Sequence, residues 1–348
     1  MKAWFTRLFT SAPKPTSTPS ASEASSAAAP AGPRAAALAP QPAAPAQARA
    51  GGRSNIDVAF LCWLVDQPGA ARAQTSARET RALQVLDHLA SDAGAHQGVL
   101  PRAAAVVPQL LARLRDAASS SSQLAEYVTR DVTLVAEVMR ISNSAHYRRG
   151  EPVVELGHAI RLVGHSGLQS AIARSVLRPV FDARGGELVT RTAKRLWEHT
   201  QHKAQLCAAL ARSEGQDPFE GYLMGLVHNA VWSAVLRSLD GVESNEPWSF
   251  SPTLVMALGL RRDRLFEIIA RKWQLSESLT RVAADVAGGG LAEAASVQGR
   301  VLGAGDRLAS LVCIPNLSSD ETASMGSLGE SVRQCFEDSR REQSATSV

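Results

Sequence analysis

The segment DPFEGYLMGLVHNAVW (217–232) constrains the fold most, because it joins a clear helix start to apolar residues on two faces. Asp217 is suited to the N-cap, Pro218 stands at the first helical position, and Glu220 stands where a capping box places its carboxylate. One face carries Phe219, Leu223, Leu226 and Ala230, and the opposite face carries Met224, His228, Val231 and Val235. A helix that is apolar on two faces is buried on both sides, so we expect it at the centre of a helical domain.

The rest of the chain after Ile56 also carries helix signals. Asp131 is suited to a second N-cap, and the helix that it begins is expected to end near Asn143. A later amphipathic stripe stops at Gly164, and Ser166 begins another helix. Further helices are expected over residues 193–213, 263–275 and 276–287. No period-two strand pattern or hairpin turn is present in the sequence, which predicts an all-α fold.

The composition changes near residue 55. Residues 1–55 are rich in Ala, Pro and Ser, and eight of the 17 prolines lie before residue 46, so this segment is predicted to be a disordered tail. It carries a net charge of +5, whereas residues 56–348 carry −1 and show no clustered basic face. Nucleic acid is therefore not expected as a partner. The polar stretch 313–348 is predicted to be a C-terminal tail, with at most a frayed helix around Val332 and Phe336.

Two features bear on the cellular location. No run approaches the roughly 18 apolar residues that a membrane span needs, and the four cysteines show no metal-ligand or disulfide spacing. A cytoplasmic protein is expected. Residues 1–10, MKAWFTRLFT, carry apolar side chains at helical spacing, which allows weak contact with the inner-membrane surface as well as a solvated, frayed start.

Several polar side chains fall on or near the apolar faces of predicted helices. A rotation of about 100° per residue places His199 inside the stripe of the helix over 193–213, whereas His202 falls on its edge and is expected to face solvent. His228 lies on the central helix, and Asp306 lies on the inward side of a helix near the C-terminus. An inward carboxylate requires a partner.

Two interpretations of these side chains are open at this point. In the first, the two histidines and the aspartate, together with the amide of Asn229, converge from three helices on a metal ion. In the second, they satisfy one another in a buried hydrogen-bond network. Spacing alone favours the network.

Four segments, read in order, resemble the HDOD domain, a bacterial relative of the HD phosphohydrolases. They are LAEYVTRDVTLVAEVMRISNSAHY (124–147), AIRLVGHSGLQSAI (159–172), RLWEHTQHKAQLCAALA (195–211) and GYLMGLVHN (221–229). The resemblance covers about residues 100–312. It implies an HDOD-type multi-helix bundle over that range, preceded by a helical extension over 56–99.

The resemblance also assigns roles to the polar side chains. In HD enzymes a His, a His-Asp doublet and a later Asp hold the metal, and these positions correspond here to His199, His228 with Asn229, and Asp306. The doublet therefore has a neutral amide in place of its carboxylate. All eight histidines lie at or before residue 228, and where active relatives supply a further downstream pair of ligands, near RVAADVAGG, only Asp285 is available here. Lewis-acid activation of water needs a firmly held metal, so these four residues are expected to be vestiges of a metal site.

These observations predict a non-catalytic, signal-transducing HDOD module that binds other signalling proteins, with a signalling nucleotide as a second class of ligand. No catalytic residue, metal or cofactor is expected. The alternative is a metal-dependent phosphohydrolase, such as a cyclic-dinucleotide phosphodiesterase, in which Asn229 is tolerated and a divalent ion is the cofactor.

Overall fold

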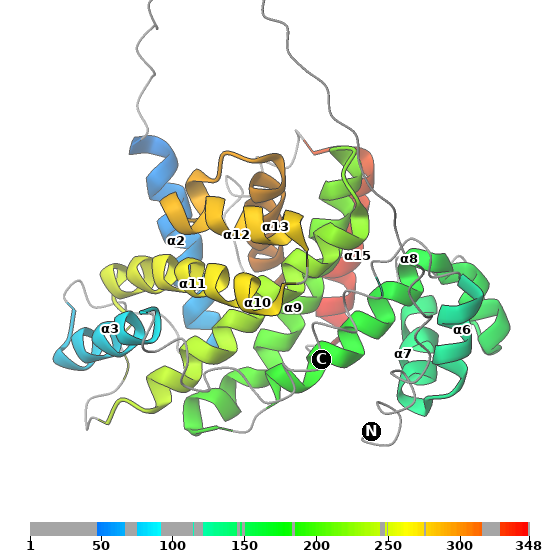
Figure 1. The fold of residues 1–348 in the computed structure, drawn as a ribbon, viewed down its shortest axis with the longest axis horizontal. Helices are drawn as coiled ribbons and strands as arrows, with labels where there is room; N and C mark the ends of the chain where they lie inside the picture. The colour runs from blue at the N-terminus through cyan, green and yellow to red at the C-terminus, as the bar shows by residue number, and fades with distance from the viewer. Residues whose placement is uncertain are drawn as a thin grey trace, which may run out of the picture. The chain divides into compact units, whose positions relative to one another are not determined.

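The computed structural model describes residues 47–66, 75–91, 114, 121–144, 147, 150–182, 185–243, 248, 250–274, 276–314 and 328–346. All of them belong to one compact unit, Ala46–Val348. Within these ranges every regular element is a helix and no strand occurs, which confirms the predicted all-α class (Figure 1). Residues 1–46, and with them the apolar start MKAWFTRLF, lie outside the described residues.

The described α-helices are α2 (Gln47–Leu64), α3 (Ala77–Leu89), α6 (Ser121–Thr129), α7 (Val132–Ser142), α8 (Leu156–Leu177), α9 (Glu187–Ser213), α10 (Pro218–Asp240), α11 (Pro252–Trp273), α12 (Glu277–Gly289), α13 (Val297–Cys313) and α15 (Glu330–Thr346). Two short 3-10 helices, η2 (Arg178–Phe181) and η3 (Leu291–Glu293), follow α8 and α12. Helix α2 begins at Gln47, so it crosses the boundary expected at residue 55 between tail and helical extension. None of the helices within the described ranges combines the length and apolarity needed to cross a membrane.

Helices α9 and α10 pack along each other and form the centre of the unit (Figure 1). Nearly every side chain of α10 from Phe219 to Leu236 is buried, as the two apolar faces predict. The Asp217 carboxylate caps α10 by accepting from the Phe219 amide at 2.8 Å, and Glu220 accepts from the Ser276 hydroxyl at the start of α12. The predicted N-cap Asp217 and the Pro218 at the first helical position are therefore confirmed, whereas Glu220 binds the start of α12 and no capping box marks the start of α10.

Small residues allow the central helices to approach closely. A Cβ atom at Gly225 of α10 would lie 2.8 Å from the Ala204 Cα atom of α9. Likewise, a Cβ atom at Gly305 of α13 would lie 2.3 Å from the Cys207 sulfur of α9. Neither position has room for a side chain. The glycines therefore allow α10 and α13 to pack closely against α9.

Helices α6, α7 and α8 pack on one another and connect to the centre through α8 and α10. The Asp131 carboxylate caps α7 and Asn143 ends it, as predicted. The Asn143 side chain also holds the Val153 backbone, accepting from its amide at 2.7 Å and donating to its carbonyl at 2.8 Å. Gly164 leaves the helical conformation with a φ of 64° that is accessible to glycine, so α8 consists of two helical segments that meet at a kink where the break was predicted.

The C-terminal region corrects two predictions. The polar stretch expected to be a frayed tail contains the 17-residue helix α15, which packs on α9 and α13 and buries Val332 and Phe336. This helix also covers His202, which was expected to face solvent and is only 6% exposed. The His202 Nε2 atom lies 3.1 Å from Gln343 Oε1. Both predictions were wrong because they treated each helix alone, and the cover comes from an element 141 residues further along the chain.

Candidate functional site

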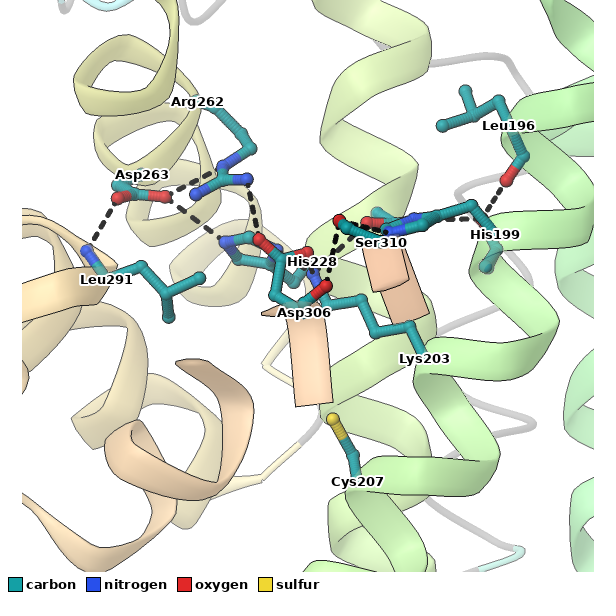
Figure 2. Close-up of polar contacts among 12 residues, drawn as sticks. Leu196, His199, Lys203, Cys207, His228, Arg262, Asp263, Leu291, Asp306 and Ser310 are labelled. Carbon is teal, nitrogen blue, oxygen red and sulfur yellow. Dashed lines mark hydrogen bonds and ion pairs between the residues drawn. The ribbon is translucent and has the colours of Figure 1, made fainter. Parts of the chain in front are cut away.

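The structure brings the four predicted polar residues together at the meeting point of α9, α10 and α13. His199 lies on α9, His228 lies on α10 and Asp306 lies on α13 (Figure 2). Asn229 follows His228 on α10. The two histidines and Asn229 have no exposed surface. The Asn229 amide nitrogen lies 2.9 Å from His199 Nδ1 and donates to the Thr200 hydroxyl at 3.0 Å.

A lysine that the sequence analysis did not single out stands at the centre of this group. Lys203 lies on α9 one turn after His199, and its side chain is fully buried. Its Nζ atom lies 2.5 Å from His228 Nδ1 and donates to Asn229 Oδ1 at 3.1 Å. It also forms an ion pair with Asp306 Oδ1 at 2.7 Å. An ammonium has three donors, and here it faces three acceptors.

Arg262 and Asp263, at adjacent positions of α11, complete the charge balance. Arg262 pairs with Asp306 at 3.2 Å and with Asp263 at 2.9 Å. The other Asp263 oxygen accepts from the Leu291 backbone amide at 2.8 Å, which ties η3 to the cluster (Figure 2). Two cations therefore face two carboxylates, and with neutral histidines the cluster has no net charge.

The hydrogen bonds fix the direction of donation through the cluster. His228 accepts from Lys203 at Nδ1, so its proton lies on Nε2 and is donated to Asp263 Oδ1 at 3.2 Å. His199 accepts from Asn229 at Nδ1, so its Nε2 donates to the Ser310 hydroxyl at 3.2 Å. The Asn229 side chain thus needs both an oxygen and an NH₂ group. An aspartate has only acceptors, so it could not make the same contacts.

Burial and neighbouring charges keep both imidazoles neutral. Burial, assisted by Lys203 and Arg262, lowers the pKa of His228 to about 3. Burial likewise lowers the pKa of His199 to about 3, against the opposing pull of Asp306. Aromatic rings close the site from outside, with Phe60 4.4 Å from the His199 ring and Phe266 4.9 Å from the His228 ring, measured between centroids.

The two carboxylates remain charged because their partners are cations. Burial alone would raise the pKa of Asp306, but Lys203 and Arg262 hold it well below its usual range. Burial lowers the pKa of Lys203, and the same carboxylate opposes that shift. The pair is therefore best described as an ammonium facing a carboxylate, each of which offsets part of the other's desolvation.

These residues do not fit a divalent metal. The ammonium of Lys203 lies between His228, Asn229 and Asp306, which are the groups that would have to converge on an ion. Among the described residues, no group of three or more His, Cys, Asp or Glu side chains is placed to hold a metal ion. Asp285, the downstream ligand candidate, instead accepts from the backbone amides of Ala295 and Ser296 and fixes the loop before α13.

Sequence analysis missed Lys203, Arg262 and Asp263. A signal for the lysine was present, because it follows His199 by four residues and Leu196 by seven, and so falls on the same inward stripe of α9. The Arg262-Asp263 pair had no comparable signal. Its position depends on how α11 packs against α10, which no local pattern reveals.

Comparisons with known proteins agree with the fold. A model of the HDOD domain matches residues 100–287. An uncharacterised protein of Treponema pallidum (strain Nichols) is 25% identical over 171 residues, 45% of this chain and 31% of that protein, so the match spans about a third of the relative's length.

Two solved structures share the fold over most of the chain. One, from Shewanella amazonensis SB2B, is named as a candidate metal-dependent phosphohydrolase; it has a TM-score of 0.52 and 17% identity, covering 77% of this chain and 100% of that one. The other is an HDOD domain protein of unknown function from Geobacter sulfurreducens, with a TM-score of 0.52 and 18% identity, covering 77% and 94%.

Proposed function

The chain belongs to the HDOD domain family, and from this premise we propose that it is a non-catalytic signal-transduction module, which acts by binding partners and hydrolyses nothing at its central site. The single observation that carries the proposal is the Lys203 ammonium among His228, Asn229 and Asp306. The class of partner, other signalling proteins, rests on the family.

Electrostatics support a site that rejects a metal. At about 4 Å and an effective dielectric near 20, a dication and an ammonium repel each other by about 8 kcal/mol. The ion would also have to displace the ion pair of Lys203 with Asp306, which leaves a buried cation without its counter-charge. The neutral oxygen of Asn229 attracts a metal ion only weakly, so it offsets little of this repulsion.

The rival function is metal-dependent phosphohydrolysis, and one experiment separates the two. The full chain is incubated with Mn²⁺, Fe²⁺ or Zn²⁺, passed over a desalting column, and assayed for bound metal and for hydrolysis of bis-p-nitrophenyl phosphate and a cyclic dinucleotide. We expect metal far below one ion per chain and no metal-dependent hydrolysis. Stoichiometric metal that disappears in His199→Ala, accompanied by hydrolysis, would overturn the proposal.

A pair of variants tests whether Lys203 is the barrier. Asn229→Asp alone should bind Mn²⁺ no better than the parent protein, because the ammonium still fills the position. Asn229→Asp combined with Lys203→Met should bind Mn²⁺ at least tenfold more tightly in a calorimetric titration, because the carboxylate returns and the cation is gone. Equal affinity in the single and double variants would show that Lys203 does not exclude the metal.

A further inference from the structure

A cavity of about 70 Å³ lies where α7 and α8 meet α9, α10 and α15. It shares no lining residue with the Lys203 cluster, so it is a separate site. Ser170 and Arg174 of α8 face it, as do Ala208 and Arg212 of α9 and Tyr222 of α10. No aspartate or glutamate is among the described residues that line it. The wall therefore offers donors and one permanent buried charge, with no carboxylate to balance it from within.

Arg174 supplies that charge. Its side chain is 6% exposed, and its Nε atom lies 2.9 Å from Glu137 Oε1 of α7, outside the cavity wall. Glu137 is shared, because Arg140 also binds it through Nε at 3.2 Å and Nη2 at 3.0 Å. Two guanidinium groups thus share one carboxylate. The buried Arg174 is therefore only partly neutralised, and a second anion nearby would stabilise it.

The geometry of the guanidinium suits an oxygen ligand. Arg174 lines the cavity, and its contact to Glu137 runs through Nε, so that carboxylate does not engage its two terminal nitrogens. A guanidinium presents its donors in a planar fork that matches carboxylate and phosphate oxygens. The ring of Trp197 packs 5.3 Å from the guanidinium carbon and helps to hold the group in place.

Two other polar groups of the cavity, on Tyr222 and Arg212, also favour a bound anion. The Tyr222 hydroxyl stays protonated and able to donate, because burial raises its pKa to about 12. Arg212 is exposed at the rim and adds a second positive charge at the entrance. One water needs about 10–15 Å³ of such space, so about 70 Å³ accommodates several waters or one group of phosphate or carboxylate size.

We propose that this cavity binds a small oxyanion, a phosphate or carboxylate group, which pairs with the buried Arg174. The inference goes beyond the proposed function and does not depend on it, since the Lys203 cluster takes no part. Because the walls come from α8 on one side and from α9, α10 and α15 on the other, an occupied cavity also ties these elements together.

Titration calorimetry of the full chain with inorganic phosphate, adenosine monophosphate and succinate tests the proposal. At least one of the three should bind with one site per chain, and the comparison identifies whether a phosphate, a phosphate ester or a carboxylate is preferred. Arg174→Lys keeps the charge but loses the planar fork, so it should weaken binding at least tenfold. The proposal is overturned if none of the three binds at millimolar concentration.

A second variant keeps the test decisive in case Arg174→Lys does not fold. Ala208→Leu fills the cavity without touching any charge, and it should abolish binding, while Ala284→Leu on the exposed side of α12 should leave the affinity unchanged. Circular dichroism checks that each variant is folded. If Arg174→Lys does not fold, Ala208→Leu decides: binding as tight as in the parent protein would place the anion elsewhere and refute the proposal.

Discussion

At the scale of single residues, Lys203 explains why buried imidazoles and carboxylates persist without serving as metal ligands. Its ammonium lies within hydrogen-bonding distance of His228 Nδ1 and Asn229 Oδ1 and forms an ion pair with Asp306 Oδ1. A buried charge is costly unless it is paired and hydrogen-bonded, and here both conditions hold. The lysine is thus a fixed internal cation, and the cluster depends on it.

Removal of this cation should be strongly destabilising. Lys203→Met keeps most of the side-chain volume but leaves two buried acceptors unsatisfied and Asp306 with Arg262 as its remaining cation, so we expect a loss of about 3–5 kcal/mol in the free energy of unfolding. Urea denaturation measures it. The matched control is Lys194→Met on the same helix, where the side chain is 78% exposed and a change within about 0.5 kcal/mol is expected. Similar losses in the two variants would contradict the role given to Lys203.

The residues of the site differ in how far sequence could predict them. His199 and His228 were placed inward correctly, because the apolar stripe around each is continuous and a helix repeats its faces every 3.6 residues. Lys203 shares the stripe of His199 but was passed over, since lysine is almost never fully buried. His202 was placed outward because the predicted surface of α9 took no account of α15, which covers it.

At the scale of helices, the site exists because α10 and α9 approach more closely than ordinary side chains allow. Gly225 lies three residues before His228, on the side of α10 that faces Ala204 and Lys203. The missing side chain lets the two backbones touch, which brings Asn229 within hydrogen-bonding distance of His199. Helix starts and stops were predictable from Asp131, Asp217 and Gly164, because caps and kinks are local. The contact between helices is not local, and no cap predicts it.

A methyl group at this contact should separate the helices. In Gly225→Ala the new Cβ atom would lie 2.8 Å from the Ala204 Cα atom, so the backbones must shift, and we expect a loss of about 1–3 kcal/mol in stability. Gly259→Ala in α11 is the control, because its Cβ atom meets nothing within 4 Å and alanine favours the helix by about 1 kcal/mol. Thermal unfolding should show opposite shifts for the two variants, and a stabilised Gly225→Ala would refute the close contact.

At the scale of the whole molecule, burial of neutral histidines couples folding to pH. His199, His202 and His228 are all buried, and burial lowers the pKa of His202 to about 4 and the pKa values of the other two to about 3. An unfolded histidine titrates near pH 6.5. Between the folded pKa values and pH 6.5, the unfolded chain binds more protons than the folded one. The stability that comes from burying neutral histidines is therefore fully present above about pH 6.5 and is lost as the pH falls.

This loss of stability at low pH is large enough to be measured by urea unfolding. At pH 5.5 each such histidine lowers the free energy of unfolding by about 1 kcal/mol relative to pH 8, so the three together should remove about 3–4 kcal/mol. Asp306 and Asp263 have pKa values below the usual carboxylate range, so their loss of charge comes at still lower pH. Urea unfolding at intervals between pH 8 and pH 5 should show the decline, and His202→Gln should reduce its slope by about a third. His158→Gln, at an exposed position of α8, should leave the slope unchanged. A stability that stays constant from pH 8 to pH 5 would mean that the imidazoles gain protons within the folded chain, and the neutral, lysine-centred cluster would have to be abandoned.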